Sequence, residues 1–233
     1  MLKNKPKNTL RLAKFLAQAG VSSRRKAEEL ILAGLVKIGG NIVKDVTTNV
    51  LASQNNITVK GQPVILEEKV YYLLNKPRGY ICSVTDPHND QTVIKLLPKE
   101  PRVVPVGRLD MDSSGLLLLT NDGDLTYQLT HPKFEVKKTY VATVNKKLDR
   151  KVVLMLKKGI YLSEGLAQAD RVRILNDYAL EIVIHQGWNR QIRRMLGELG
   201  YHVELLTRIA EGKLKLGNLA SGQYKKLKLE GIL

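Results

Sequence analysis

The sequence predicts an α+β protein, with a small helical N-terminal domain followed by a larger domain built on a mixed, mostly antiparallel sheet. Three observations support this prediction. Positive charge is densest near the N-terminus, helix-like apolar spacing occupies residues 12–33, and strand-like runs dominate from Val70 onward. The expected organisation is a flexible basic arm over 1–8, a first domain over 9–67 and a second over 69–233.

The composition restricts the class of protein. Among 233 residues, 38 Lys and Arg stand against 22 Asp and Glu, and the formal net charge is +16. Such a surplus favours a polyphosphate partner. No apolar run approaches the roughly 20 residues that cross a bilayer, and the basic N-terminus lacks the apolar segment of a secretory signal. Cys82 is the single cysteine, which excludes an internal disulfide and a cysteine-based zinc site. We therefore expect a cytoplasmic protein with no membrane contact.

The positive charge is unevenly distributed. Up to Leu66 there are 11 Lys and Arg but only 3 Asp and Glu, so the first 66 residues carry half of the net charge. This asymmetry predicts a compact basic domain followed by a more balanced one, joined near the short charged segment 67–69.

The first domain begins with two predicted helices. One apolar face, spaced as in a helix, precedes Gly20, which suits the C-terminal end of that helix. Ser22 or Ser23 can cap a second helix that ends at Gly34. Two strand pairs are expected to follow. They are 36–38 with 42–43, and 57–60 with 64–66 around the turn 61–63.

A basic triplet lies in the first turn of the second predicted helix. Arg24, Arg25 and Lys26 would strengthen the preference of a helix N-terminus for anions, although a solvated helix face is the plainer interpretation. The order helix, turn, helix, hairpin over 9–59, with Ser-Ser-Arg-Arg between the helices, resembles the small RNA-binding domain named after a ribosomal small-subunit protein. A DNA-binding helix-turn-helix shares the same outline.

The second domain contains more predicted strands than helices. The strands are expected at 70–74, 103–106, 116–119, 138–144, 171–174 and 179–184. The helices are expected at 124–129, 150–158 and 191–199.

Residues 103–123 are the most informative segment, because two apolar strands flank a loop that carries an arginine and two aspartates. Asp110 and Asp112 can simply cap loop amides. They also match the start of a calcium loop, but position twelve is Asn121 instead of Glu, and the flanks look like strands. A carboxylate held between two buried strands is also well placed for covalent catalysis.

Four motifs resemble the RsuA/RluB family of ribosomal RNA pseudouridine synthases. Gly-Arg-Leu-Asp at 107–110, continued by Ser-Gly-Leu-Leu-Leu-Leu-Thr-Asn-Asp-Gly at 114–123, is similar to the family signature. Leu-Asn-Lys-Pro-Arg-Gly at 74–79 is similar to its opening segment, and Lys-Thr-Tyr at 138–140 to its Lys-Thr-Tyr strand. Asn-Arg-Gln-Ile-Arg-Arg-Met at 189–195 is similar to its late basic helix.

This resemblance implies an isomerase that converts a uridine of ribosomal RNA to pseudouridine and needs no cofactor. It implies that Asp110 is the nucleophile, that Tyr140 lies against the uracil, and that Arg193 holds Asp110 ionised. Arg108 would occupy the space left by the flipped base.

Further basic residues are candidate RNA contacts. Lys76 and Arg78 are expected to contact phosphate, and the basic face of the late helix adds Arg190 and Arg194. Trp188 departs from the family, which often has a basic residue there, and it could stack on a base.

The four histidines are scattered without ligand spacing, so no metal site is expected. Two functions other than the enzyme are also compatible with the sequence. A ribosome-assembly factor could use the same basic surfaces without chemistry. A metal-dependent nuclease could use Asp110 and Asp112. The enzyme is our main prediction, as a monomer acting on structured ribosomal RNA.

Overall fold

The computed structural model describes residues 9–54, 56–84, 86 and 90–232; the expected arm over 1–8 and His88 lie outside these ranges. Contacts divide the chain between Lys69 and Val70 into two compact units, and each is described by itself. Within the described ranges, no helix combines the length and apolar character needed to span a membrane.

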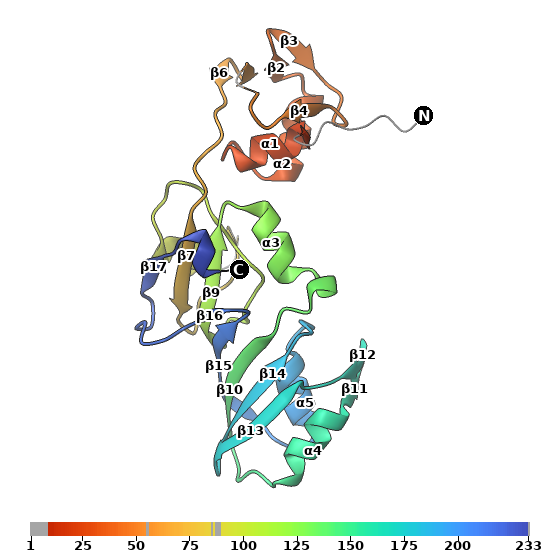
Figure 1. Cartoon of the computed structure of the whole chain (residues 1–233), viewed down its shortest axis with the longest axis vertical. Coiled ribbons are helices and arrows are strands. Elements are labelled where there is room, and N and C mark those ends of the chain that lie inside the picture. The colour runs from red at the N-terminus through yellow and green to blue at the C-terminus, as the bar shows by residue number, and fades with distance from the viewer. Residues whose placement is uncertain (1–8, 55, 85, 87–89, 233) are drawn as a thin grey trace. The chain divides into compact units, whose positions relative to one another are not determined.

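The first unit combines two helices with short strands (Figure 1). Its elements are β1 (Thr9–Arg11), α1 (Leu12–Gln18), α2 (Arg24–Leu32), β2 (Val36–Ile38), β3 (Asn41–Val43), β4 (Asn49–Leu51), β5 (Ile57–Val59) and β6 (Gln62–Pro63). The predicted cap of the second helix is confirmed, because the Ser23 hydroxyl accepts a hydrogen bond from the Lys26 backbone N–H at 3.3 Å. The apolar faces of both helices pack on one core with strand residues such as Val36 and Ile57.

One strand of this unit differs from the prediction. Lys60 and Gly61 both have positive φ, at 50° and 82°, and together form a two-residue hairpin turn. The partner of β5 is therefore Gln62–Pro63 and not 64–66, while the Val64 side chain is buried in the core. The pairing of β1 with β4 was not predicted, because each has only three residues.

The second unit is built on a mixed sheet of nine strands. Its strands are β7 (Tyr71–Lys76), β8 (Val104–Pro105), β9 (Ser114–Thr120), β10 (Lys138–Val144), β11 (Ile160–Leu162), β12 (Gly165–Ala167), β13 (Arg171–Asn176), β14 (Ala179–Ile184), β15 (Val203–Glu211), β16 (Leu214–Lys215) and β17 (Tyr224–Lys226). Its helices are α3 (Gly123–Thr130), α4 (Lys151–Lys158) and α5 (Gln191–Glu198), with 3-10 turns η1 (Val93–Leu96), η2 (Pro132–Phe134) and η3 (Leu229–Gly231). Strands β11 and β12 form a separate hairpin.

The main path of the sheet is β13-β14-β10-β15-β9-β7-β17, and β10 lies between β14 and β15 (Figure 1). Most of its pairs are antiparallel, as predicted, while β15 pairs with β9 in parallel. Because β15 lies between β9 and β10, the start of β9 is two strands away from β10. The loop that carries Asp110 and Asp112 directly precedes this start.

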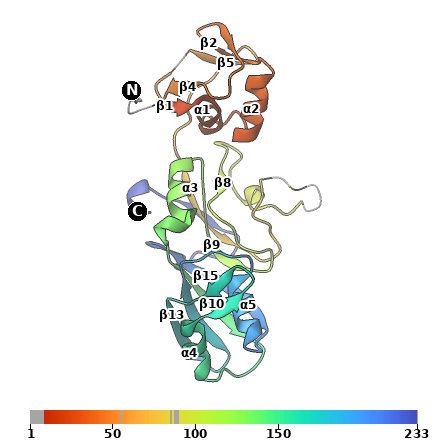
Figure 2. The ribbon, with the colours of Figure 1, turned by 90° about the vertical axis from the view of Figure 1, so that its right-hand side faces the viewer.

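Alternating side chains place a separate core on each face of the sheet. Leu117 and Leu119 of β9 join the core that contains α4 and α5, whereas Leu116 and Leu118 join the core that contains α3. The run of four leucines is thus a strand buried on both faces. Helix α4 lies beside β13 in both views (Figures 1 and 2).

Candidate active site

The aspartates lie on the loop between β8 and β9, which we call the 107–113 loop. Its backbone is fastened to the end of β7 through Lys76, a side chain with no exposed surface. The Lys76 ammonium donates to the carbonyl oxygens of Ser113 at 2.7 Å and of Asp110 at 3.1 Å, and it also reaches those of Pro77 and Met111. The loop is therefore anchored from behind by a buried positive charge.

This position corrects the prediction that Lys76 contacts phosphate. Strand β7 is buried on both faces and directs the Lys76 side chain inward, where carbonyl oxygens replace water around the ammonium. Burial lowers the pKa of Lys76. The side chain is consequently a structural part of the loop and unavailable to RNA.

Two arginines at the start of α5 hold Asp112: Arg190 directly precedes the helix, and Arg193 lies in its first turn. Arg190 binds the Asp112 carboxylate with both terminal nitrogens, at 3.0 and 3.1 Å. Arg193 lies 3.3 Å from the same carboxylate and donates to the carbonyl oxygens of Asp112 and Val203. Burial alone would raise the pKa of Asp112, but the hydrogen bonds from Arg190 and the charge of Arg193 lower it. Asp112 thus fixes the 107–113 loop to the start of α5.

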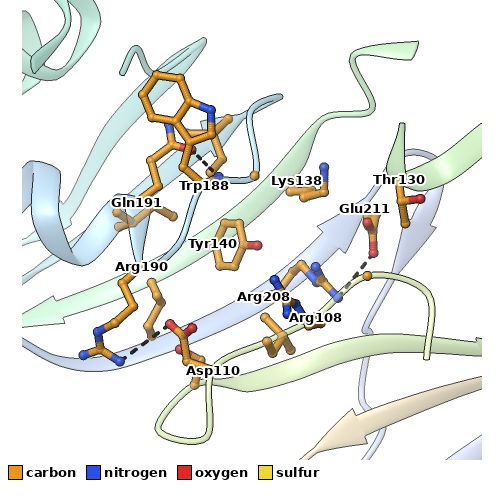
Figure 3. Close-up of a pocket in the computed structure, with 17 residues that line it drawn as sticks. Arg108, Asp110, Thr130, Lys138, Tyr140, Trp188, Arg190, Gln191, Arg208 and Glu211 are labelled. Carbon is orange, nitrogen blue, oxygen red and sulfur yellow. Dashed lines mark hydrogen bonds and ion pairs between the residues drawn. The ribbon is translucent and has the colours of Figure 1, made fainter. Parts of the chain in front are cut away.

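The Asp110 carboxylate points into a cavity of about 210 Å³ (Figure 3). Its side chain is 29% exposed, and Arg190 Nη1 lies 3.8 Å from Asp110 Oδ2. The structure therefore places Arg190 in direct ion-pair contact with Asp110, the position expected for Arg193. The carboxylate that Arg193 contacts is that of Asp112.

Tyr140 lines the same cavity from β10. It is 8% exposed and opposite Arg208 in the register of β10 with β15. Burial raises the pKa of Tyr140, and the hydrogen bond from the Arg208 guanidinium acts in the opposite direction. Tyr140 is therefore a neutral phenol at neutral pH, held by a cation beside its hydroxyl.

Arg208 and Glu211 are site residues that the sequence prediction missed. Both line the cavity from β15, are 1% exposed, and approach within 3.4 Å of each other. Arg208 also donates from Nε to the Leu116 carbonyl oxygen at 2.7 Å. In the sequence, the available signal is a charged pair three residues apart within an otherwise strand-like run.

Gly115 is needed where β9 meets β15. A Cβ at this position would lie 2.3 Å from the Arg208 carbonyl oxygen, and Gly115 has φ of +104°. Only glycine accommodates both conditions. The close approach holds the end of the 107–113 loop next to the strand that carries Arg208.

Arg194, a predicted RNA contact, is paired with a carboxylate in this structure. Its guanidinium binds the Glu164 carboxylate through two hydrogen bonds, at 2.7 and 2.8 Å, and contacts Ser163 at 3.1 Å. Glu164 and Ser163 form the turn between β11 and β12. Arg194 therefore connects this hairpin to α5, and its contact with RNA stays a prediction.

The remaining predicted RNA contacts are exposed. Arg108 lines the cavity, and Arg78 follows Lys76 on the surface. In the first unit, Arg24, Arg25 and Lys26 are all exposed at the start of α2, with Glu28 3.8 Å from Arg24. These side chains can reach a polyanion without leaving a buried partner unpaired.

The site is a small cavity lined by charged and aromatic side chains. The cavity is smaller than the roughly 300–1,000 Å³ of typical sites for drug-sized ligands. It combines an exposed carboxylate on an anchored loop, a neutral phenol and several cations. Among the described residues, no group of three or more His, Cys, Asp or Glu is arranged to hold a metal.

Comparisons with known families agree with both units. The family described as RNA pseudouridylate synthase matches residues 70–198, and the S4 domain family matches residues 10–55. The first match contains Asp110 of the 107–113 loop, Tyr140 of β10 and Arg190, which directly precedes α5.

Similar proteins span nearly the whole chain. A ribosomal large subunit pseudouridine synthase B of Bacillus subtilis is 42% identical, with 93% of this chain and 91% of the relative covered. An uncharacterized RNA pseudouridine synthase of Aquifex aeolicus is also 42% identical, with 94% and 90% covered. A solved pseudouridylate synthase is 32% identical with a TM-score of 0.69, covering 96% of this chain and 98% of that one. The chain therefore belongs to the RNA pseudouridylate synthase family and is an isomerase that converts uridine in RNA to pseudouridine.

Proposed function

We propose that the protein modifies a specific uridine of ribosomal RNA and that Asp110 is the nucleophile. The observation that supports this role best is the placement of the Asp110 carboxylate. It is 29% exposed, on a loop anchored by Lys76, and it shares a cavity with Tyr140. Ribosomal RNA as the substrate also makes the cytoplasm the proposed location.

The proposed reaction leaves the composition of the nucleotide unchanged. The bond between the ribose carbon and uracil N1 breaks, the base turns, and a bond forms from the same ribose carbon to uracil C5. The proton on C5 then leaves, and N1 gains one. Asp110 attacks either the ribose carbon or the uracil ring and departs before the product is released.

Neighbouring groups have separate roles in this proposal. Arg190, 3.8 Å from Asp110, balances the carboxylate charge. Tyr140 packs against the uracil, and its hydroxyl, next to Arg208, relays the proton that C5 loses. Arg193 is a positioning residue, because it acts on Asp110 through the backbone and carboxylate of Asp112.

RNA binding is proposed to involve both units. Arg24, Arg25 and Lys26 contact phosphates at the N-terminus of α2, where helix amides also favour anions. Arg78 and Arg108 contact the RNA around the flipped nucleotide. The name of the Bacillus subtilis relative supports a target in the large-subunit RNA.

Mapping of pseudouridine in cells tests this function. In cells whose only copy carries Asp110→Asn, we expect one or a few pseudouridines of ribosomal RNA to disappear, while the variant protein still binds RNA. Asp177→Asn is the matched control, since Asp177 is an exposed carboxylate paired with Lys147. It should leave the map unchanged.

Two results would contradict the proposal. An unchanged map in the Asp110→Asn cells would remove Asp110 from the chemistry. A map unchanged even after deletion of the gene, with ribosome assembly impaired, would instead support an assembly factor that binds RNA without modifying it.

A further inference from the structure

An exposed aromatic cluster lies at the end of α3, outside the cavity. Tyr127 is 47% exposed and Phe134 is 43% exposed, and His131 lies between them in the sequence. Only 5% of the chain is Phe, Trp or Tyr, so two such rings at one exposed place are unusual. We call Tyr127, His131, Lys133 and Phe134 the α3–η2 surface.

The side chains of this surface hold one another in place. The Tyr127 ring lies 4.7 Å from the His131 ring and 5.7 Å from the Phe134 ring, the latter edge to face at 89°. The Lys133 ammonium lies 4.9 Å from the centre of the Tyr127 ring and 4.7 Å from that of Phe134. His131 Nδ1 accepts a hydrogen bond from the Lys133 backbone N–H. The rings therefore pack against one another and against Lys133.

The α3–η2 surface begins next to the cavity. Thr130 lines the cavity (Figure 3), and His131 is the following residue. Tyr127 precedes Thr130 by three residues, which is less than one turn of helix, or about 5 Å along the axis. A nucleotide chain with one base in the cavity can thus have a neighbouring base at the surface.

The charge around the surface favours a polyanion. Lys133 is exposed beside the rings, Lys137 is exposed three residues after Phe134, and Arg108 is exposed at the cavity. Glu135 is the exposed acidic residue of the same segment. Exposed rings combined with cations are the usual components of sites that bind unpaired nucleotides, because every base has a face that can stack.

We propose that the α3–η2 surface binds an unpaired base of the RNA that neighbours the flipped uridine. This proposal rests on the proposed function, because it takes the occupant of the cavity to be a uridine in RNA. Removing a base from its stack costs a few kcal/mol and leaves its neighbour without a stacking partner. Tyr127 or Phe134 supplies that partner, and Lys133 contacts the adjoining phosphate.

RNA binding by a double variant tests the surface. In an Asp110→Asn background, which prevents turnover, Tyr127→Ala with Phe134→Ala should weaken binding of a 12-nucleotide oligouridylate by at least about tenfold. Binding of a 12-base-pair RNA duplex should change by less than about twofold. Tyr127→Phe with Phe134→Tyr keeps both rings and should retain affinity. Tyr178→Ala, at a residue 51% exposed in the β13–β14 turn, is the matched control and should have no effect.

Crosslinking gives an independent measurement. An oligouridylate that contains 5-iodouridine should crosslink on irradiation to Tyr127 or Phe134, identified by mass spectrometry of the peptide. Equal affinity of the double variant and its parent for the oligouridylate would overturn the proposal. So would an equal loss with Tyr178→Ala, or an equal loss for duplex and single strand.

Failure of this inference and failure of the proposed function are distinguishable. In the protein that keeps Asp110, Tyr127→Ala with Phe134→Ala should still modify ribosomal RNA. Its kcat at saturating RNA concentration should be retained, and its KM should be raised. Suppose that Asp110→Asn loses modification but the double variant binds the oligouridylate normally. Asp110 would then remain the proposed nucleophile, and the proposal for the α3–η2 surface would be wrong.

Discussion

The second unit contains buried cations, whereas no described Lys or Arg of the first unit is buried. In the second unit, Lys76 and Arg208 are buried, and Arg194 binds Glu164, so these cations hold the protein itself together. In the first unit, Arg25 and Lys26 are exposed at the start of α2. The number of lysines and arginines thus indicates a polyanion partner, whereas burial decides which of them can contact it.

Replacement of Lys76 should give the largest effect. Lys76→Met removes the donor shared by four carbonyl oxygens and leaves them buried without it. We expect a loss of about 3 kcal/mol in the free energy of unfolding of the second unit, together with loss of activity. Trp188, the single tryptophan, lies in this unit, so denaturation followed by its fluorescence is the measurement.

Replacement of an exposed lysine should have almost no effect on stability. Lys157→Met on α4 is the control and should change stability by less than about 0.5 kcal/mol. If Lys76→Met kept full stability and instead weakened RNA binding in a salt-dependent way, Lys76 would be a phosphate contact after all.

Replacement of exposed cations in the first unit should affect RNA binding alone. Arg25→Gln with Lys26→Gln should leave the unfolding transition unchanged, because neither side chain is buried. RNA affinity should fall, and the slope of log K against log salt should decrease by about 1 for each phosphate that the variant no longer binds. Titration of ribosomal RNA at several salt concentrations measures this.

The matched control uses two exposed lysines of the second unit. Lys157→Gln with Lys158→Gln removes the same charge from α4. An equal decrease of the slope in both double variants would show that total charge, and not the position at α2, determines RNA binding.

The pH dependence of the β11–β12 hairpin should give the smallest effect. Hydrogen bonds from Arg194 lower the pKa of Glu164 from its ordinary 4.5 to about 2. The lowered pKa in the folded state means that the stabilisation is present above about pH 4.5 and is lost as pH falls through 2. The Tm of the parent protein should therefore exceed that of Glu164→Gln near pH 6, by an amount that shrinks toward pH 2. A constant difference in Tm would show that Glu164 acts by packing and not by charge.

Local patterns predicted much of the fold. The Ser23 cap set the start of α2, and the bounds predicted for β10 and β14 agree with the structure. Strand β15 was missed because Arg208 and Glu211 interrupt its apolar pattern. Those residues are tolerated inside the protein because they face each other and the cavity, a relation that only the folded sheet creates.

Some residues of the candidate site could be predicted from the sequence, and others could not. The resemblance to the RsuA/RluB family pointed to Asp110 and Tyr140, and the structure brings both to one cavity. Sequence could not show that Lys76 is buried, since a lysine at a strand end is usually solvated. It also could not separate Arg190 from Arg193, because the two are only three residues apart at the start of α5 and their different contacts depend on where the 107–113 loop lies.

Release of hydrogen from uracil C5 tests the central claim most directly. When C5 joins the ribose, its hydrogen leaves to water, so ribosomal RNA labelled with tritium at this position reports each turnover. With RNA from cells that lack the gene, the purified protein should release tritium, and Asp110→Asn should release none above background while binding the same RNA. Tritium release by Asp110→Asn at the rate of the parent protein would contradict the account.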